Sequence, residues 1–173
     1  MLKRLNKTDK TIDAGPSRVL VVDDHPEAAK LLGKLLRRSG YEVAEVADDQ
    51  VVLLTLTNEA TPITAVVASF SYAGTGAALK LLDGIRHAPE PRVNQCRVIV
   101  VADSSSQLMF AWQSGADAII ERPYSSAQLV SELDAAIERT NEERTAHRAE
   151  HIARLREVVS AAATRSGFAA EQG

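Results

Sequence analysis

The sequence predicts an α/β protein built on a doubly wound, five-stranded parallel sheet, followed by a C-terminal helical extension. Between Arg18 and Thr140, short apolar runs alternate five times with segments of helical periodicity, which is typical of a parallel sheet with helices on its faces. The first run, residues 19–22, is apolar at every position, as expected for a strand that is covered on both sides. A functional site in such a sheet lies beyond the carboxyl ends of the strands, so the loops after the first, third and fourth strands matter most.

Composition narrows the class of protein. Apolar residues make up 45% of the 173 residues, which excludes disorder of the whole chain and fits one globular domain. The formal net charge of −3 gives no strong field that would favour nucleic acid or an anionic membrane as the main partner. The single cysteine, Cys96, can form no internal disulfide, and no stretch approaches the roughly 20 apolar residues of a membrane-spanning helix. We therefore expect a cytoplasmic protein with no membrane span.

The chain divides into three parts. Residues 1–17 carry several basic side chains without an apolar stretch behind them, so we expect a flexible basic tail rather than a secretory signal. Residues 18–140 form the predicted domain. Residues 141–173 are predicted to be a helical extension with a frayed end.

Local signals place the elements of the domain. The strands are predicted at residues 19–22, 41–46, 63–68, 98–101 and 118–120. The helices are predicted after residue 24, over residues 49–57 and 77–86, up to about residue 114, and from residue 125 onward. Pro26 lies in the first turn of the first helix, where a missing N–H costs nothing, and Gly40 and Gly115 are placed to end helices. Ser125 and Gln128 have the spacing of a capping box.

Two adjacent carboxylates, Asp23 and Asp24, follow the first strand directly. At a separation of about 4 Å they repel by roughly 4 kcal/mol at an effective dielectric near 20, so a cation between them is expected if both are ionised. Mg²⁺ is the usual ion, because it binds one or two carboxylates and keeps waters for phosphate oxygens. The alternative is that Asp24 only caps the first helix and Asp23 is solvated.

An arginine reaches the same edge of the sheet from another strand. Arg122 follows the fifth strand and precedes Pro123, so the peptide bond between them can be cis. The alternative is an ordinary surface charge.

Three runs resemble the receiver domain of response regulators in two-component signalling. They are VLVVDDHP at residues 19–26, SGADA at residues 114–118, and Arg122–Pro123 followed by an aromatic residue. The resemblance covers about residues 18–140 and implies a flavodoxin-like (βα)5 fold with strand order 2-1-3-4-5. It also implies a histidine kinase or another regulator as partner.

The resemblance implies a site that is degenerate here. The family uses an acidic pair for Mg²⁺, an aspartate after strand three as phosphoacceptor, a Ser or Thr after strand four, a Lys before proline, and an aromatic residue in strand five as the switch. Only the acidic pair is kept. Ser69 takes the position of the phosphoacceptor, with Ala68 or Phe70 as alternatives. Ala102 takes the position of the Ser or Thr after strand four, Arg122 that of the Lys before proline, and Ile119 that of the aromatic switch residue.

Each replacement has a chemical consequence. The hydroxyl of Ser69 has no evident base beside it and is no substitute for a nucleophilic carboxylate. Without a third carboxylate, a metal site at Asp23 and Asp24 should be vestigial, so we expect weak Mg²⁺ binding or none and no other cofactor. We further expect the planar guanidinium of Arg122 to pair with Asp23 or Asp24 in the space of the missing metal.

The histidines and the single tryptophan give weaker signals. His147 and His151 are four residues apart on a predicted helix, but without a third ligand we expect them to be surface residues. Trp112 fits core packing, although it lies on the face of the fourth helix, fifth strand and fifth helix, where receivers commonly meet partners or each other.

The extension carries a second apolar stripe. No glycine or proline occurs from Thr140 to Glu157, which predicts a long helix or a helical hairpin. Residues 142–150 are almost wholly polar, so a continuous coiled coil is disfavoured, and the stripe beyond them should pack against a partner, a second copy or the receiver itself. The predicted interaction surface consists of Trp112, Tyr124, Ile152, Leu155 and Val159.

Three functions remain open. The first is a non-catalytic, receiver-like signalling module, not an enzyme, that acts by protein–protein interaction without conventional aspartyl phosphorylation. It could form a homodimer through the face that holds Trp112 or through the C-terminal helix, and direct DNA binding is not expected. The second is a phosphorylatable stand-alone response regulator that uses Asp24 or Asp103 as a non-standard acceptor. The third is a metal-dependent enzyme, for which the sequence offers no nucleophile or base.

Overall fold

The computed structural model describes residues 15–58, 60 and 62–170, with side chains up to residue 167. Most of the predicted basic tail lies outside these residues. The five strands are β1 (Arg18–Val22), β2 (Glu42–Val46), β3 (Ala65–Ala68), β4 (Arg97–Ala102) and β5 (Ala118–Glu121). They form one parallel sheet in the order β2-β1-β3-β4-β5, which confirms the predicted fold and places the switch in strand order between β1 and β3.

Helices cover both faces of the sheet. They are α1 (Pro26–Arg38), α2 (Asp49–Asn58), α3 (Thr75–Arg86), α4 (Pro91–Asn94), α5 (Leu108–Gln113), α6 (Ser126–Glu138) and α7 (Asn141–Ala170), with a 3₁₀ turn η1 (Ser105–Gln107) before α5. One apolar cluster joins α1 and α6 to the sheet, and a second joins α2, α3, α4 and α5 to its other face. Within β1, Val19 and Val21 enter the first cluster and Leu20 and Val22 the second, so every residue of the apolar run is used.

The local signals act mainly as predicted. Gly40 and Gly115 adopt positive φ after their helices, and the Ser125 hydroxyl accepts a hydrogen bond from the N–H of Gln128. The cap of α1, however, is His25, whose Nδ1 accepts from the N–H of Ala28, so the alternative in which Asp24 caps this helix is wrong. The short helix α4, which begins at Pro91, was not among the predicted helices.

The extension is a separate helix rather than a continuation of α6. Arg139 leaves the helical conformation with φ −64° and ψ 134°. Thr140 and Glu143 then form a capping box, in which the N–H of Thr140 donates to Glu143 Oε2 (2.7 Å) and the N–H of Glu143 donates to Thr140 Oγ1 (3.2 Å). The sharp change of direction lets α7 return across the domain.

A buried ion cluster fixes the first half of α7 to the domain. Asp117, which directly precedes β5, accepts from Arg144 Nε (2.6 Å), Arg86 Nη2 (2.7 Å) and Arg148 Nη2 (3.3 Å). We call these four residues the Asp117 cluster. Burial raises the pKa of Asp117, but hydrogen bonding and charge from Arg144, together with the charge of Arg86, hold that pKa below its usual value.

Two arginines of the cluster, Arg86 and Arg144, also donate to main-chain oxygens. Arg86 donates to the carbonyls of Asn94, Cys96 and Gly115. Arg144 donates to the carbonyls of Gln95 and Cys96 and to the side chain of Asn141. Together with the bonds to Asp117, all five N–H groups of each of these two guanidinium groups have an acceptor.

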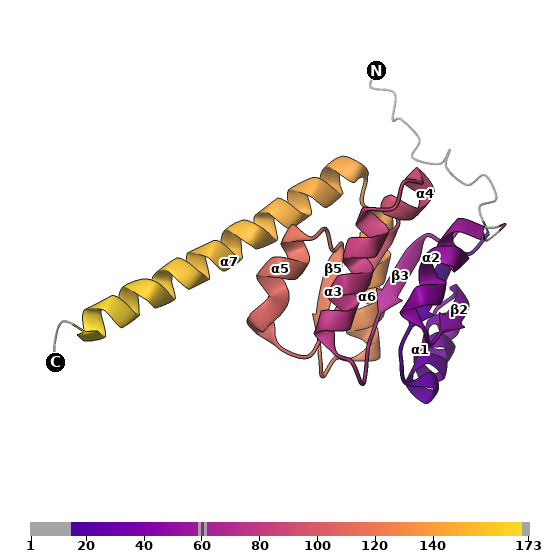
Figure 1. Ribbon diagram of the computed structural model, residues 1–173, viewed down its shortest axis with the longest axis horizontal. Helices are drawn as coiled ribbons and strands as arrows, with labels where there is room; N and C mark the ends of the chain where they lie inside the picture. The colour runs from indigo at the N-terminus through magenta and orange to yellow at the C-terminus, as the bar shows by residue number, and fades with distance from the viewer. Residues whose placement is uncertain (1–14, 59, 61, 171–173) are drawn as a thin grey trace, which may run out of the picture.

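Aromatic contacts extend the docking of α7 along α5. Trp112 stacks on His151 with ring centroids 4.2 Å apart and meets the edge of His147 at 5.5 Å. The two histidines are half-buried, so the expectation that they are surface residues is wrong. Figure 1 shows α7 passing α5 and then running beyond the rest of the domain. Within the part of the chain that the structure describes, no helix has the length and apolar character needed to span a bilayer.

Replacing Arg144 by alanine should release α7 and destabilise the domain. The change leaves the buried carboxylate of Asp117 without its closest partner, so we expect the free energy of unfolding to fall by about 3 kcal/mol. The matched control is Arg154→Ala, since Arg154 forms an exposed pair with Glu150 on the same helix and its loss should cost under about 0.5 kcal/mol. Urea unfolding measures both, and equal losses would contradict a structural role for the Asp117 cluster.

The docking of α7 should weaken as the pH falls. Burial lowers the pKa of His147, and the charges of Arg139 and His151 lower it further, against Glu150 and Asp117. Burial also lowers the pKa of His151, and the charge of Arg154 adds to this, against Glu150 and Glu132. The unfolded chain therefore takes up protons near pH 6.5 while the folded chain does not, so stability is full above that pH and declines below it.

Unfolding at pH 7.5 and pH 5.5 checks this expectation, with Trp112 fluorescence as the reporter because it is the only tryptophan. A variant with both His147→Gln and His151→Gln should lose less stability over this interval than the unmodified chain. An identical loss in the two proteins would assign the pH dependence to other groups.

Candidate functional site

A polar pocket lies at the carboxyl edge of the sheet, next to the switch in strand order. Asp23 follows β1, Ser69 follows β3, Asp103 follows β4 and Arg122 follows β5. The register pairs Val22 with Ala68, which brings Asp23 and Ser69 side by side. Asp23, Ser69 and Arg122 line a cavity of about 340 Å³.

Asp23 is buried and its carboxylate is fully hydrogen-bonded. Only 1% of the residue is exposed. Its Oδ1 accepts from the N–H of His25 (2.9 Å) and of Ser71 (3.1 Å), and its Oδ2 accepts from the hydroxyls of Ser71 (2.8 Å) and Ser69 (3.3 Å). A carboxylate offers about four acceptor positions, so the charge of Asp23 is met entirely by donors of the protein.

Asp24 holds the same loop from its other side. Its Oδ1 accepts from the N–H of Tyr72 (3.0 Å) and its Oδ2 from the N–H of Ala73 (2.7 Å). Burial raises the pKa of Asp24, but these main-chain hydrogen bonds hold that pKa below its usual value. The acidic pair thus anchors residues 69–74, which we call the β3–α3 loop.

Arg122 pairs with a different carboxylate from the one expected. Its Nη1 lies 2.6 Å from Asp103 Oδ1, and its Nη2 donates to the Ser69 hydroxyl at 2.9 Å. The expectation that it pairs with Asp23 or Asp24 is wrong, because the β3–α3 loop already satisfies both and Asp103 follows the strand next to β5. The peptide bond between Arg122 and Pro123 is cis.

Asp103 is held in turn by α3. Its N–H donates to the hydroxyl of Thr75 (3.0 Å), and that hydroxyl lies 3.4 Å from Asp103 Oδ2. The loop after β4 is therefore tied to the first turn of α3 as well as to Arg122.

Of the three candidates for the phosphoacceptor position, Ser69 is the one that faces the pocket. Ala68 and Phe70 pack in the apolar cluster beneath α2 and α3. The Ser69 hydroxyl lies between Asp23 and Arg122, so a carboxylate oxygen does stand beside it, which the sequence did not reveal.

Ala102 and Ile119, two further positions named from the sequence, bring no polar group to the pocket. Ala102 ends β4 as a buried methyl group, and Ile119 in β5 is half-buried against the α3 side of the sheet. Tyr124 is half-buried and lines the pocket, and burial raises its pKa. Trp112 is buried beneath α7, so a partner could reach it only where α7 is displaced.

The arrangement does not fit a magnesium ion. Mg²⁺ needs free oxygen lone pairs in near-octahedral geometry, whereas Asp23 accepts four hydrogen bonds and each oxygen of Asp24 accepts one main-chain N–H. Asp103, the next carboxylate along the edge, is engaged by Arg122. Among the described residues, no group of three or more His, Cys, Asp or Glu side chains is placed to hold a metal.

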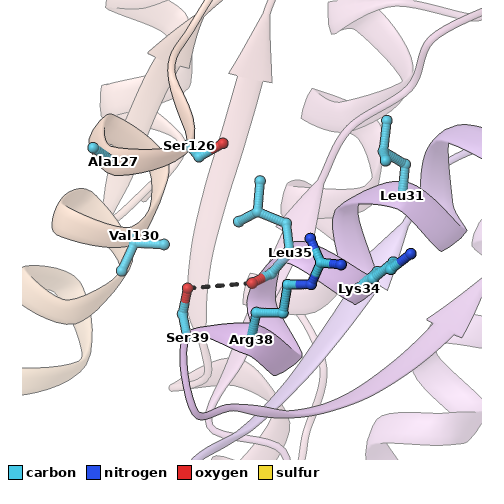
Figure 2. Close-up of a pocket in the computed structure, with 8 residues that line it drawn as sticks. All are labelled: Leu31, Lys34, Leu35, Arg38, Ser39, Ser126, Ala127 and Val130. Carbon is cyan, nitrogen blue, oxygen red and sulfur yellow. Dashed lines mark hydrogen bonds between the residues drawn. The ribbon is translucent and has the colours of Figure 1, made fainter.

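The pocket continues into an apolar groove between α1 and α6. Leu31, Leu35 and Ser126 line both, and the groove has a volume of about 560 Å³. Figure 2 shows Leu31 and Leu35 on α1 opposite Val130 on α6, with Lys34 beside them. Leu31 is 70% exposed, so the groove presents an apolar side chain to solvent.

Comparison with known proteins identifies the family. The family model of the response regulator receiver domain matches residues 19–134. This chain belongs to the response regulator receiver family. Chemotaxis protein CheY-3 of Vibrio cholerae is 27% identical to it over 122 residues, which cover 70% of this chain and 92% of CheY-3.

Solved structures agree on the fold of this receiver. The chemotaxis response regulator CheY4 of Vibrio cholerae is 18% identical with a TM-score of 0.59, over 70% of this chain and 98% of that one. A response regulator from Thermotoga maritima is 20% identical with a TM-score of 0.60, over 72% and 99%. Neither relative spans the whole of this receiver, and the described part of α7 reaches residue 170, well past the end of the family match.

Two sets of functional residues were missed from the sequence. Ser71 was missed because the β3–α3 loop does not align without gaps to the family pattern. The Asp117 cluster was missed because its residues are far apart in sequence and two of its arginines, Arg144 and Arg148, lie in a polar stretch. The one usable signal was Thr140–Glu143, whose capping-box spacing marks the start of α7.

Ser71→Ala should destabilise this receiver by about 1–3 kcal/mol, because a buried carboxylate would lose a short hydrogen bond. The matched control is Ser104→Ala, whose exposed hydroxyl meets only Ser106, and its cost should stay within about 0.5 kcal/mol. Chemical denaturation of the two variants compares these costs. If Ser71→Ala were as harmless as the control, the β3–α3 loop could not depend on Asp23.

Proposed function

We propose that this receiver is a non-catalytic signalling module that acts through protein–protein contacts without conventional aspartyl phosphorylation. The observation that carries the proposal is the position of the Ser69 hydroxyl and its two hydrogen bonds. A hydroxyl stands where a receiver needs a carboxylate nucleophile, and it is already hydrogen-bonded to Asp23 and Arg122.

Chemistry at Ser69 is disfavoured by its surroundings. Asp23 lies beside this hydroxyl, but its carboxylate already accepts four hydrogen bonds and holds the β3–α3 loop in place. An incoming phosphoryl group would meet the charges of Asp23, Asp24 and Asp103 with only Arg122 to offset them. We therefore propose that the site holds no metal and supports no enzymatic activity.

The switching residues are also unsuited to a phosphorylation signal. A change from 1:99 to 99:1 between two states needs about 5.5 kcal/mol of differential binding. The methyl group of Ala102 offers no hydrogen bond to a phosphoryl oxygen, and Ile119 has no polar group that could follow it. The pocket therefore lacks the contacts that would supply such an energy.

Protein partners fit the surfaces that remain open. Receivers meet signalling proteins such as histidine kinases, and we propose partners of this kind in the cytoplasm. Tyr124 and the groove between α1 and α6 offer an apolar surface with Lys34 and Arg38 at its rim. Direct binding of DNA is not part of the proposal, because the formal net charge of −3 creates no strong positive field.

One observation favours the alternative of a non-standard acceptor. Asp103 is half-exposed and lies beside Arg122, so it is the carboxylate at this edge that a phosphoryl donor could reach most easily. A receiver phosphorylated there would need the ion pair to open first.

Incubation with acetyl phosphate and Mg²⁺, followed by intact-mass measurement, tests the proposal. We expect no added phosphate, while a receiver with an aspartate after its third strand serves as the positive control. An acid-labile phosphate on this chain would overturn the proposal. Its loss in Asp103→Asn but not in Asp24→Asn would then assign the acceptor.

A further inference from the structure

Positive charge exceeds negative charge in the Asp117 cluster. Three arginines surround one carboxylate, which leaves a surplus of two positive charges. Water screens them poorly, because the side chains of Arg86, Arg144 and Arg148 are only 14%, 5% and 25% exposed. Burial lowers the pKa of Arg86 and the charge of Asp117 raises it, while the charges of the other two arginines lower it again. The cations therefore repel one another, and an anion beside them would be attracted by the surplus.

The three arginines line a polar hollow at the amino edge of the sheet, which is the edge opposite the pocket of Asp23. The hollow has a volume of about 280 Å³ and lies between the end of α3, the turn from α4 to β4 and the start of α7. Figure 1 shows the start of α7 at the same end of the domain as α4. The other residues that line the hollow are Asn94, Gln95, Asn141 and Thr145. No acidic side chain is among the described residues of this lining.

Arg148 has hydrogen-bond donors that the protein does not use. Among the described residues, its one acceptor is Asp117 Oδ1 at 3.3 Å, and its Nε is buried without an acceptor. Arg86 and Arg144 differ, because all five N–H groups of each have an acceptor. Asn141 adds a donor, since its Oδ1 accepts from Arg144 Nη1 (3.0 Å) and its NH₂ group is left for a ligand. Arg148 and Asn141 would thus contact an anion directly, while Arg86 and Arg144 would act through their charge.

The start of α7 adds to the positive potential of the hollow. Asn141 is the first residue of this helix, and the N–H groups of a first helical turn form the positive end of the helix dipole. Two acidic residues follow in the same turn, Glu142 and Glu143. Neither lines the hollow, and Glu143 accepts from the N–H of Thr140 instead.

We propose that this hollow binds a small anion that carries a phosphate group, either inorganic phosphate or a small phosphomonoester. Such a group carries a charge of about −1.5 to −2 at pH 7, which matches the surplus of two positive charges, whereas a monocarboxylate would cancel half of it. The planar fork of Arg148 suits two phosphate oxygens. The volume lies below the roughly 300–1,000 Å³ of pockets for drug-sized ligands, which favours a small anion over a nucleotide.

Binding would make the docking of α7 depend on this ligand. Arg148 and Asn141 belong to α7, whereas Arg86 and Gln95 lie on the other side of the hollow, so the anion would join the two sides. A ligand that binds only the docked state stabilises that state as its concentration rises. The proposal goes beyond the proposed function, because the hollow lies at the other edge of the sheet from Ser69.

Isothermal titration calorimetry of the full chain at pH 7.5 and constant ionic strength tests the site. We expect saturable binding of one anion per chain when inorganic phosphate or glycerol 3-phosphate is titrated, and the tighter of the two identifies the source of the phosphate group. Acetate, with a single charge, should bind much more weakly. The proposal would be overturned if neither phosphate compound bound, or if acetate bound equally well.

Asn141→Asp is the sharpest variant, because it keeps an acceptor for Arg144 while it places a negative charge at the hollow. The dissociation constant for phosphate should rise by about tenfold or more, and Arg148→Gln should raise it by a similar factor. The matched control is Ser160→Asp, which adds the same charge to an exposed position far along α7 and should leave the constant unchanged. Phosphate binding that survives both Asn141→Asp and Arg148→Gln would contradict the proposed site.

A further variant separates the hollow from the pocket at the carboxyl edge, where Arg122 is another cation that could attract phosphate. Arg122→Gln should leave the dissociation constant unchanged, because Arg122 lies at the opposite edge of the sheet. Circular dichroism should show that every variant is folded at the temperature of the titration. Loss of binding in Arg122→Gln, with binding retained in Asn141→Asp, would place the anion in the pocket of Asp23 and overturn the proposal.

Discussion

The buried charge of Asp23 is the constraint on which the site depends. A carboxylate at this depth needs compensation, and here the β3–α3 loop provides it through two serine hydroxyls and a main-chain N–H, with a further N–H from His25. The same hydrogen bonds fix the loop against β1 and turn hydrogens toward the place where a cation would sit. The receiver thus keeps the acidic pair of its family but uses it as an anchor for a loop.

Sequence predicted the sheet well because its signals are local. Apolar runs, glycines after helices and cap residues each act within a few residues, so the strands and their order followed from periodicity and family resemblance. The site was predicted only in part. The positions of Asp23 and Ser69 followed from the strand ends, but the partner of Arg122 did not, because charges can be counted in a sequence while the N–H donors of an unaligned loop cannot.

The docking of α7 also depends on contacts between distant residues that a local sequence pattern does not reveal. Residues 142–150 are polar, which by pattern alone argues against burial. Arg144 is nevertheless buried, because Asp117, the main-chain carbonyls of Gln95 and Cys96 after α4, and the side chain of Asn141 accept from its five N–H groups. Those carbonyls become available only once the fold has brought the ends of helices together. A polar segment can therefore dock as firmly as an apolar one when the acceptors come from distant elements.

The two ends of the domain differ in how firmly they are held, and this difference bears on signalling. At the pocket, the loop before α5 is tied by the half-exposed pair of Arg122 and Asp103, which is worth about 1 kcal/mol or less. At the other end, α5 is held by Trp112 under α7 and by the buried Asp117 cluster. Opening the weak pair could shift an equilibrium only about fivefold, far short of a full switch. The strong end would hold α7 in one position throughout. A weakly held pocket and a firmly docked α7 suit a receiver that presents α7 in a fixed position. This difference supports the proposal that the chain signals through protein–protein contacts.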